Sequence, residues 1–145
     1  MDSLHASVII NKPVKEVFAY AASPINGPAY IPNLNENINI TPETPSLGQK
    51  FDWRFNLMGV DIKGSAEVTE YDPPHKVVLK TTGDSNSTWV FTFSDENGTT
   101  KVTAGLEYDV VESALQRIAN RIILQTVNQK NTELMLDNLK TILET

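Results

Sequence analysis

Few side chains in this sequence could carry out nucleophilic, acid–base or metal chemistry. The chain has no cysteine, which excludes a thiolate nucleophile and cysteine ligands for a metal. Its two histidines, His5 and His75, lie far apart, and neither belongs to an HxH or HExxH pattern. The GxSxG, GxGxxG and P-loop motifs are also missing from the sequence. The residues therefore predict no metal site, no bound cofactor and no familiar catalytic constellation.

A small set of polar side chains remains for a buried site. Tyr30 and Tyr108 could each place a hydroxyl in a cavity, although core tyrosines as often hydrogen-bond the backbone. Arg54 alternates outwards with its neighbours, so we expect it to pair with surface carboxylates. A one-residue bulge would instead turn it inwards, where it could bind an anionic ligand group. Asn128 and Asn131 cannot transfer protons at neutral pH, but they can orient a carbonyl group.

Alternating apolar residues predict the strands that would position these side chains. In the stretch FDWRFNLMGVDIKGSAEV, residues 51–68, apolar and polar residues alternate on both sides of Met58-Gly59. This pattern predicts two strands joined by a tight turn, each with one apolar face. Further strands are expected around residues 4–10, 38–40, 77–79, 89–93 and 102–108, with two short helices between the first and second strands.

The C-terminal segment, from about Glu112 to Leu143, contains no glycine or proline. We therefore expect one helix of about 45 Å, at 1.5 Å per residue. Consecutive hairpins followed by a long helix indicate a curled antiparallel sheet whose single apolar face is covered by that helix. These elements predict one α+β domain that spans residues 1–145.

The expected C-terminal helix carries two stripes. One comprises Met135, Leu139 and Ile142 and, extended back along the helix, Asn131, Asn128, Leu124, Arg121 and Arg117. The other, about half a turn away, comprises Leu115, Ile118, Ala119, Ile122, Ile123 and Val127. Either the helix kinks near residues 127–131 so that both stripes face the core, or its first half has apolar groups facing outwards. In the second case the asparagines lie inside a cavity mouth, and the Leu115–Val127 stripe forms a gate or a homodimer patch.

The inward face of the sheet is expected to carry large apolar side chains. Such residues usually fill a dry core. On a strongly curved sheet, however, large aromatic side chains cannot all reach one helix, and apolar clefts with few polar groups are the usual ligand sites. We therefore predict a ligand-binding cavity formed by Tyr30, Trp53, Phe55, Ile62, Val68, Leu79, Trp89, Phe91, Leu106, Tyr108, Leu124, Asn128, Asn131 and Met135.

Composition and charge narrow the range of partners. The 145 residues are 40% hydrophobic and 21% charged, which is typical of a globular domain. A formal net charge of −6 argues against binding nucleic acid or anionic membranes through charge. No segment has the pattern of a signal peptide or the roughly 20 apolar residues of a membrane span. We expect a cytoplasmic protein without stable membrane insertion.

Several segments act as markers of a fold rather than of a reaction: INKPVKEVFAYAASPING, GQKFDWRF, EVTEYDPPHKVV, ENGTTKVT and NTELMLDNLKTILE. Through them the chain resembles, over essentially its whole length, the START-like, Bet v 1-like (SRPBCC) superfamily, and more closely its bacterial polyketide cyclase/dehydrase and lipid-transport group. The resemblance implies a helix-grip fold, in which a curved seven-stranded antiparallel sheet wraps around a long C-terminal helix. It also implies binding of apolar small molecules, without specifying one ligand, because this fold hosts carriers, cyclases, hydrolases and regulators.

Two functions are consistent with these patterns. The first is non-catalytic binding or transport of a lipid, a polyketide or another hydrophobic metabolite. The second is a cyclase or dehydratase, which needs a positioned acid or base in the cavity. For that role the sequence offers two tyrosines, an arginine and two asparagines, so we favour binding. A dimeric regulatory module that uses the outer helix stripe is a third hypothesis.

Overall fold

The chain, seen in a computed structural model that describes residues 2–115, 117 and 121–145, combines one sheet with several helices. This α+β architecture was predicted from the sequence and is confirmed. In chain order the elements are β1 Asp2–Ile10, α1 Val14–Ala21, the 3-10 turn η1 Pro24–Asn26, α2 Gly27–Tyr30, β2 Leu34–Thr41, β3 Lys50–Leu57, β4 Val60–Asp72, β5 Lys76–Gly83, β6 Ser85–Glu96, β7 Thr99–Val110, α3 Glu112–Leu115 and α4 Arg121–Glu144.

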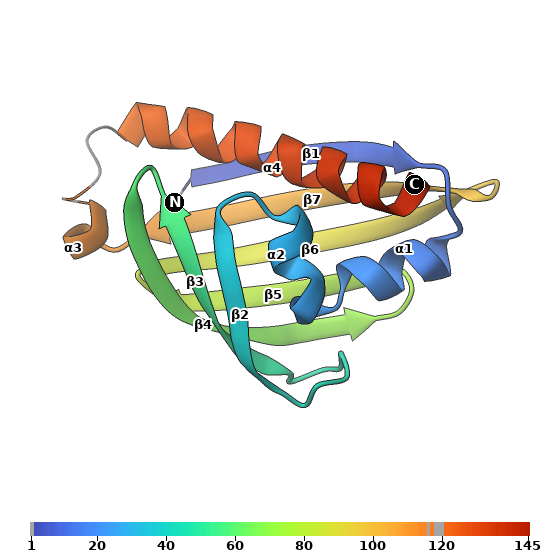
Figure 1. The fold of residues 1–145 in the computed structure, drawn as a ribbon, viewed down its shortest axis with the longest axis horizontal. Helices are drawn as coiled ribbons and strands as arrows, with labels where there is room; N and C mark the ends of the chain where they lie inside the picture. The colour runs from blue at the N-terminus through green and yellow to red at the C-terminus, as the bar shows by residue number, and fades with distance from the viewer. Residues whose placement is uncertain (1, 116, 118–120) are drawn as a thin grey trace.

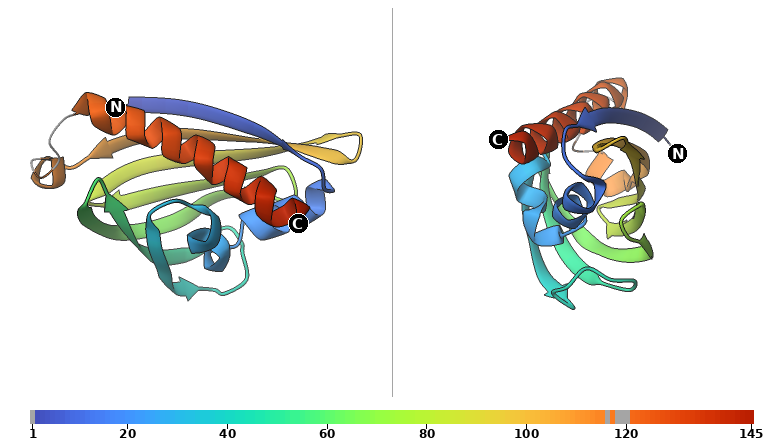
Figure 2. Two further views of the ribbon diagram at one scale, coloured as in Figure 1. Left: turned by 45° about the horizontal axis from the view of Figure 1, so that its top comes forward. Right: turned by 90° about the vertical axis from the view of Figure 1, so that its right-hand side faces the viewer.

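All seven strands form one antiparallel sheet in the order β1-β7-β6-β5-β4-β3-β2. The sheet is strongly curved, and β2 and β3 come round toward the helical side of the molecule (Figure 1). Seen from the end, α4 and the short helices lie across the open side of this curve (Figure 2). Helix α4 contacts β1 along one side and α2 along the other. This arrangement is the predicted helix-grip fold, and none of the described helices is both long and apolar enough to cross a membrane.

The C-terminal helix starts later than predicted. The expectation of one helix from about Glu112 is wrong, because α3 and α4 are separate elements, and Figure 1 shows them out of line. The amide of Arg117 donates to the carbonyl of Ala114 at 3.0 Å, which is the spacing of a tight turn rather than of an α-helix. Ala114 is fully buried beside the sheet. Tertiary packing of α3 therefore outweighs the helix propensity of a segment without glycine or proline.

The faces of α4 agree with one of the two predicted alternatives. Helix α4 continues as one α-helix through residues 127–131. Its buried residues include Leu124, Met135 and Leu139 of the first stripe, whereas Ile122 and Ile123 of the second stripe are 73% and 48% exposed. The first half of α4 therefore has apolar groups facing outwards. Two further residues of the second stripe, at positions 118 and 119, lie outside the described residues.

The apolar core is divided into two clusters at opposite ends of the sheet. One cluster includes Phe18, Phe93 and Leu136, and it packs α1 and the C-terminal half of α4 against the sheet. The other includes Trp53 and Ala114 and packs α3 and the start of α4. Leu79 and Trp89 are only partly buried and pack against both clusters. The middle of the inner face is therefore the least completely covered part of the sheet.

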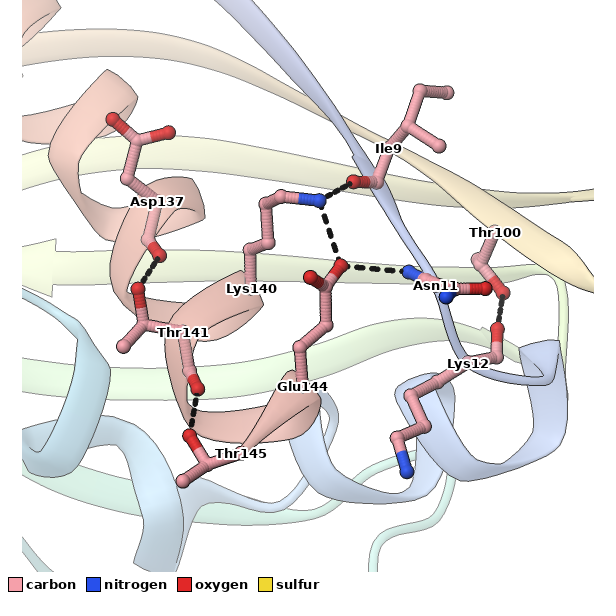
Figure 3. Close-up of polar contacts among 9 residues, drawn as sticks. All are labelled: Ile9, Asn11, Lys12, Thr100, Asp137, Lys140, Thr141, Glu144 and Thr145. Atoms are coloured by element: carbon pink, nitrogen blue, oxygen red, sulfur yellow. Dashed lines mark hydrogen bonds and ion pairs between the residues drawn. The ribbon is translucent and has the colours of Figure 1, made fainter.

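Polar contacts fix the C-terminal end of α4 to β1 (Figure 3). The ammonium group of Lys140 donates to the carbonyl of Ile9 and to the carboxylate of Glu144, both at 2.6 Å. The same carboxylate accepts a hydrogen bond from the backbone N–H of Asn11 at 2.8 Å. We call these four residues the C-terminal clamp. The clamp fixes the position of α4, the helix that covers the sheet, along the edge of β1.

The C-terminal clamp should make stability depend on pH through Glu144. The hydrogen bonds from Lys140, and then from Asn11 N–H, hold the pKa of this carboxyl below its ordinary value. A carboxyl group with a lowered folded-state pKa stabilises the protein above its unfolded-state pKa, and this stabilisation is lost as pH falls through the folded-state pKa. The Glu144→Gln variant should therefore be less stable at neutral pH and lose less stability on acidification than the wild type.

Thermal denaturation from about pH 7 down to about pH 3, the range over which carboxyl groups titrate, would measure this difference. Glu107→Gln, an exposed carboxyl on β7 outside the clamp, is the control. Parallel stability curves for Glu144→Gln and the wild type would contradict the proposed role of the clamp.

Candidate ligand-binding cavity

A cavity of about 180 Å³ lies between the inner face of the sheet and the helices. Strands β3 to β7 and α2 supply most of its lining, and α4 contributes two side chains. Leu79 and Trp89, the residues that bridge the two core clusters, both face this space. Most of the predicted site residues line the cavity, namely Tyr30, Trp53, Phe55, Ile62, Leu79, Trp89, Phe91, Leu106, Tyr108, Asn128 and Met135.

Three predicted site residues lie outside the lining. Val68 and Leu124 are 2% and 1% exposed, and each is packed inside one of the core clusters. Asn131 is half-buried on α4 but does not reach the cavity surface. The geometry gives these three residues no place in the cavity wall. That the eleven lining residues contact a ligand stays a prediction.

The sequence analysis missed the polar part of the lining. Thr81, Ser85 and Ser87 face the cavity near the turn between β5 and β6. Their positions continue the inward alternation that was recognised from Leu79 and Trp89, so extending that alternation by one or two steps would have found them. Other missed residues come from the segment between α1 and β2 and from β2 itself, where no periodic pattern points inwards: Ala22, Ser23, Pro24, Gly27, Leu34 and Asn37.

The lining contains no Asp, Glu, His, Lys or Arg among the described residues. Tyr30, which was a candidate for proton transfer, donates its hydroxyl proton to the carbonyl of Ala21 at 2.7 Å. Burial, and to a lesser extent the neighbouring Tyr20, raises the pKa of the Tyr30 phenol above its usual range. Tyr30 is therefore neutral at physiological pH, and its hydrogen bond fixes the segment between α1 and α2.

The charged candidates lie away from the cavity. Arg54 is exposed on β3, and its Nε lies 3.5 Å from a carboxylate oxygen of Glu36. The predicted role of Arg54 as a surface partner for carboxylates is confirmed, because β3 pairs with β4 without a bulge at this point. His5 and His75 are both exposed. Within the described part of the chain, no group of three or more His, Cys, Asp or Glu side chains could hold a metal ion.

Aromatic rings dominate the middle of the wall. Trp89 and Phe91 face the cavity from the same strand, with ring centroids 5.7 Å apart and planes within 8° of parallel. On the opposite side Trp53 donates its indole N–H to the carbonyl of Ser65 at 3.1 Å. The indole therefore presents an apolar surface to the cavity. A flat apolar ligand can therefore contact Trp53 without leaving its indole N–H unpaired.

Gly64 on β4 permits the position of Trp53. A Cβ atom at residue 64 would lie 2.5 Å from the indole ring and 2.0 Å from the carbonyl oxygen of Thr82 on the neighbouring strand. Such distances are far shorter than ordinary van der Waals contacts. The indole can therefore approach β4 this closely only because residue 64 has no side chain.

The curved sheet, the long covering helix and the internal apolar cavity together define a START-like, helix-grip domain. The chain belongs to the family described as polyketide cyclase / dehydrase and lipid transport, whose sequence model matches residues 1–144. A comparison with curated proteins found no match.

Solved structures share this fold at low sequence identity. The protein TTHA0849 of Thermus thermophilus superposes with a TM-score of 0.81 and 19% identity, over 97% of this chain and 95% of that chain. The Zhui aromatase/cyclase of Streptomyces sp. R1128 gives a TM-score of 0.81 and 11% identity, over 99% of this chain and 93% of that one. The di-domain ARO/CYC StfQ of the steffimycin biosynthetic pathway gives 0.77 and 18%, over 98% of this chain and 50% of that one.

Replacing Gly64 with alanine should disturb both the sheet and the cavity wall. The added methyl group must displace the backbone of β5 or the ring of Trp53, and overpacking of this kind costs about 1–3 kcal/mol. Chemical denaturation of Gly64→Ala would measure this loss. Gly105→Ala on β7 is the control, because its nearest neighbour would be the exposed His5 ring at 3.1 Å. Equal losses in the two variants would show that the close approach of Trp53 is unimportant.

Asn131 offers a test of which polar groups on α4 belong to the cavity. Its Nδ2 is buried and has no hydrogen-bond partner among the described residues. Because an unsatisfied buried donor is unfavourable, Asn131→Leu should raise the free energy of unfolding by about 1 kcal/mol. The affinity for a neutral aromatic probe such as 2-naphthol should stay unchanged, because residue 131 does not line the cavity.

Asn128→Leu is the matched variant, since it replaces the lining asparagine of the same helix and should alter probe affinity. Calorimetric titration and chemical denaturation of both variants would separate the two positions. A loss of stability in Asn131→Leu would mean that the amide has a structural partner.

Proposed function

We propose that this protein binds a neutral, mainly apolar small molecule in the cavity and acts as a carrier or receptor for it. The observation that supports this proposal is the chemistry of the lining. Aromatic and aliphatic side chains form most of the wall, and no charged side chain lines it among the described residues. Apolar pockets with a few polar groups are the usual sites for small organic ligands.

The volume of the cavity suggests a ligand size. An engineered apolar cavity of about 150 Å³ in another protein stays dry and binds benzene. A cavity of about 180 Å³ therefore suits a compound of one or two rings, unless the wall opens to accept a longer one. The stacked rings of Trp89 and Phe91 would supply a flat surface for such a compound.

The second candidate function is a cyclase or dehydratase reaction. The family description and the aromatase/cyclase names of two structural neighbours favour it. Proton transfer needs a positioned acid or base, and Tyr30 and Arg54 are both engaged elsewhere. Among the described lining residues, Tyr108 is the titratable group that would have to serve. We therefore place binding ahead of catalysis.

Two further predictions from the sequence remain open. Ile122 and Ile123 of the Leu115–Val127 stripe are exposed, and a homodimer through this stripe stays a prediction that size-exclusion chromatography with light scattering would check. The cytoplasmic location likewise stays a prediction from the N-terminal sequence.

Ligand binding should be visible in tryptophan emission, because both tryptophans of the chain line the cavity. Titration with 1-nitronaphthalene, a neutral two-ring compound that quenches indole emission, should reduce the emission saturably. Trp53→Phe and Trp89→Phe should each remove part of this quenching. Calorimetry on the same samples would give the dissociation constant.

Naphthalene-1-sulfonate is the matched control ligand, since it keeps the rings and adds a charge. Burial of a charge without a partner is unfavourable, so the sulfonate should bind at least about tenfold more weakly. If 1-nitronaphthalene gives neither quenching nor binding heat, a closed core without a ligand site is the better interpretation. Equal affinity for the two compounds would place the binding site outside this cavity.

A further inference from the structure

Along β5 and β6 the cavity wall is polar at one end and apolar along the rest. Strands β5 and β6 face each other in register, and residues that point to the same side recur every two residues, or about 7 Å. Three of their cross-strand pairs line the cavity in succession. Going toward the turn between the strands, these are Val77 and Phe91, Leu79 and Trp89, and Thr81 and Ser87.

The hydrogen bonds at the polar end have a definite direction. The hydroxyl of Thr81 lies 3.3 Å from the backbone carbonyl of Ser85 and 2.5 Å from the hydroxyl of Ser87. A carbonyl oxygen can only accept, so Thr81 donates its single proton to Ser85. The 2.5 Å contact allows either hydroxyl to donate, and with the Thr81 proton on the Ser85 carbonyl we assign the proton of this contact to Ser87. Both protons are thereby used within the protein, and the oxygen of Ser87 retains two lone pairs.

Other polar side chains of the lining are arranged in the same way. Each of four donates a proton to a backbone carbonyl of the protein at 2.7–3.1 Å, namely Ser23, Tyr30, Asn37 and Trp53. The side-chain oxygen of Asn37, by contrast, is buried without a partner among the described residues. These four side chains therefore use their donors within the protein, and Asn37 leaves an acceptor.

We propose that the ligand carries a hydrogen-bond donor, most simply a hydroxyl group, at one end of its ring system, and that the Ser87 oxygen accepts this hydrogen bond. This inference rests on the proposed binding function and specifies the class of ligand: a neutral aromatic or alicyclic alcohol. The rings lie over Leu79 and Trp89, and the hydroxyl group lies at the pair formed by Thr81 and Ser87. An ether or ketone of the same shape has no proton to donate, and it would have to break the bond between these two hydroxyls.

The test compares 2-naphthol with 2-methoxynaphthalene by calorimetry. These probes share the rings and the oxygen position but differ in the hydroxyl proton. Their hydrophobicity also differs, so the readout is the ratio of their dissociation constants, compared between protein variants. A neutral hydrogen bond corresponds to about a threefold to tenfold change in affinity, so Ser87→Ala should shift the ratio against 2-naphthol by this factor.

Ser94→Ala is the matched control, because Ser94 is exposed on the same strand and outside the cavity. It should leave the ratio unchanged. Thr81→Val supplies a second test. Its expected result would not follow if Ser87 had a merely structural role. It removes the acceptor that holds the Ser87 proton, so Ser87 becomes able to donate, and 2-methoxynaphthalene should gain affinity relative to 2-naphthol. Thermal denaturation of each variant confirms that it is folded.

The outcomes separate the two proposals. If both probes bind but the ratio is the same in the wild type, Ser87→Ala and Thr81→Val, the hydroxyl assignment is wrong and the binding function stands. A ratio that shifts in Asn128→Leu or Tyr108→Phe and not in Ser87→Ala would place the acceptor elsewhere in the lining and overturn the assignment. If neither probe binds the wild type, the proposed function and this inference both fail.

Discussion

The curvature of the sheet sets how far its inner face lies from the helices, and the rest of the structure depends on this distance. At the two ends of the sheet, apolar side chains reach across it and form the two core clusters. In the middle, Leu79 and Trp89 contact both clusters and still border open space. The cavity thus results from the shape of the layers, because one straight helix cannot contact every part of a concave sheet.

The covering helix is held from both sides, which fixes the roof of the cavity. The C-terminal clamp attaches α4 to β1, and on the other side the amide of Asn138 donates to the carbonyl of Tyr30 at 3.1 Å. Tyr30 in turn holds Ala21 through its hydroxyl. Helix α4, α2 and the end of α1 are therefore linked by directional bonds as well as by apolar packing. Such bonds specify one arrangement, whereas apolar contacts alone tolerate sliding.

Several polar side chains of the lining follow the rule that buried donors must be satisfied. A buried donor without a partner costs about 1–3 kcal/mol, so a wall that is empty of ligand is more stable when its donors bond to the protein itself. Trp53 and Tyr30 do this with backbone carbonyls. Acceptors carry a smaller penalty because a carbonyl or hydroxyl oxygen with one bond is already partly satisfied. The distribution of donors and acceptors in the wall therefore follows from the stability of the domain and also bears on which ligands fit.

The sequence by itself determined the strands, the antiparallel order and the aromatic inner face, because alternation with period two fixes which residues share a side. It thereby predicted that Trp53, Trp89 and Tyr108 face the same space. Only the tertiary structure decided that α3 and α4 are separate elements, since the burial of Ala114 depends on residues distant in sequence. It also decided which hydrogen-bonding atoms surround Ser87, because this depends on which atoms of neighbouring strands meet, and periodicity carries no information about individual atoms.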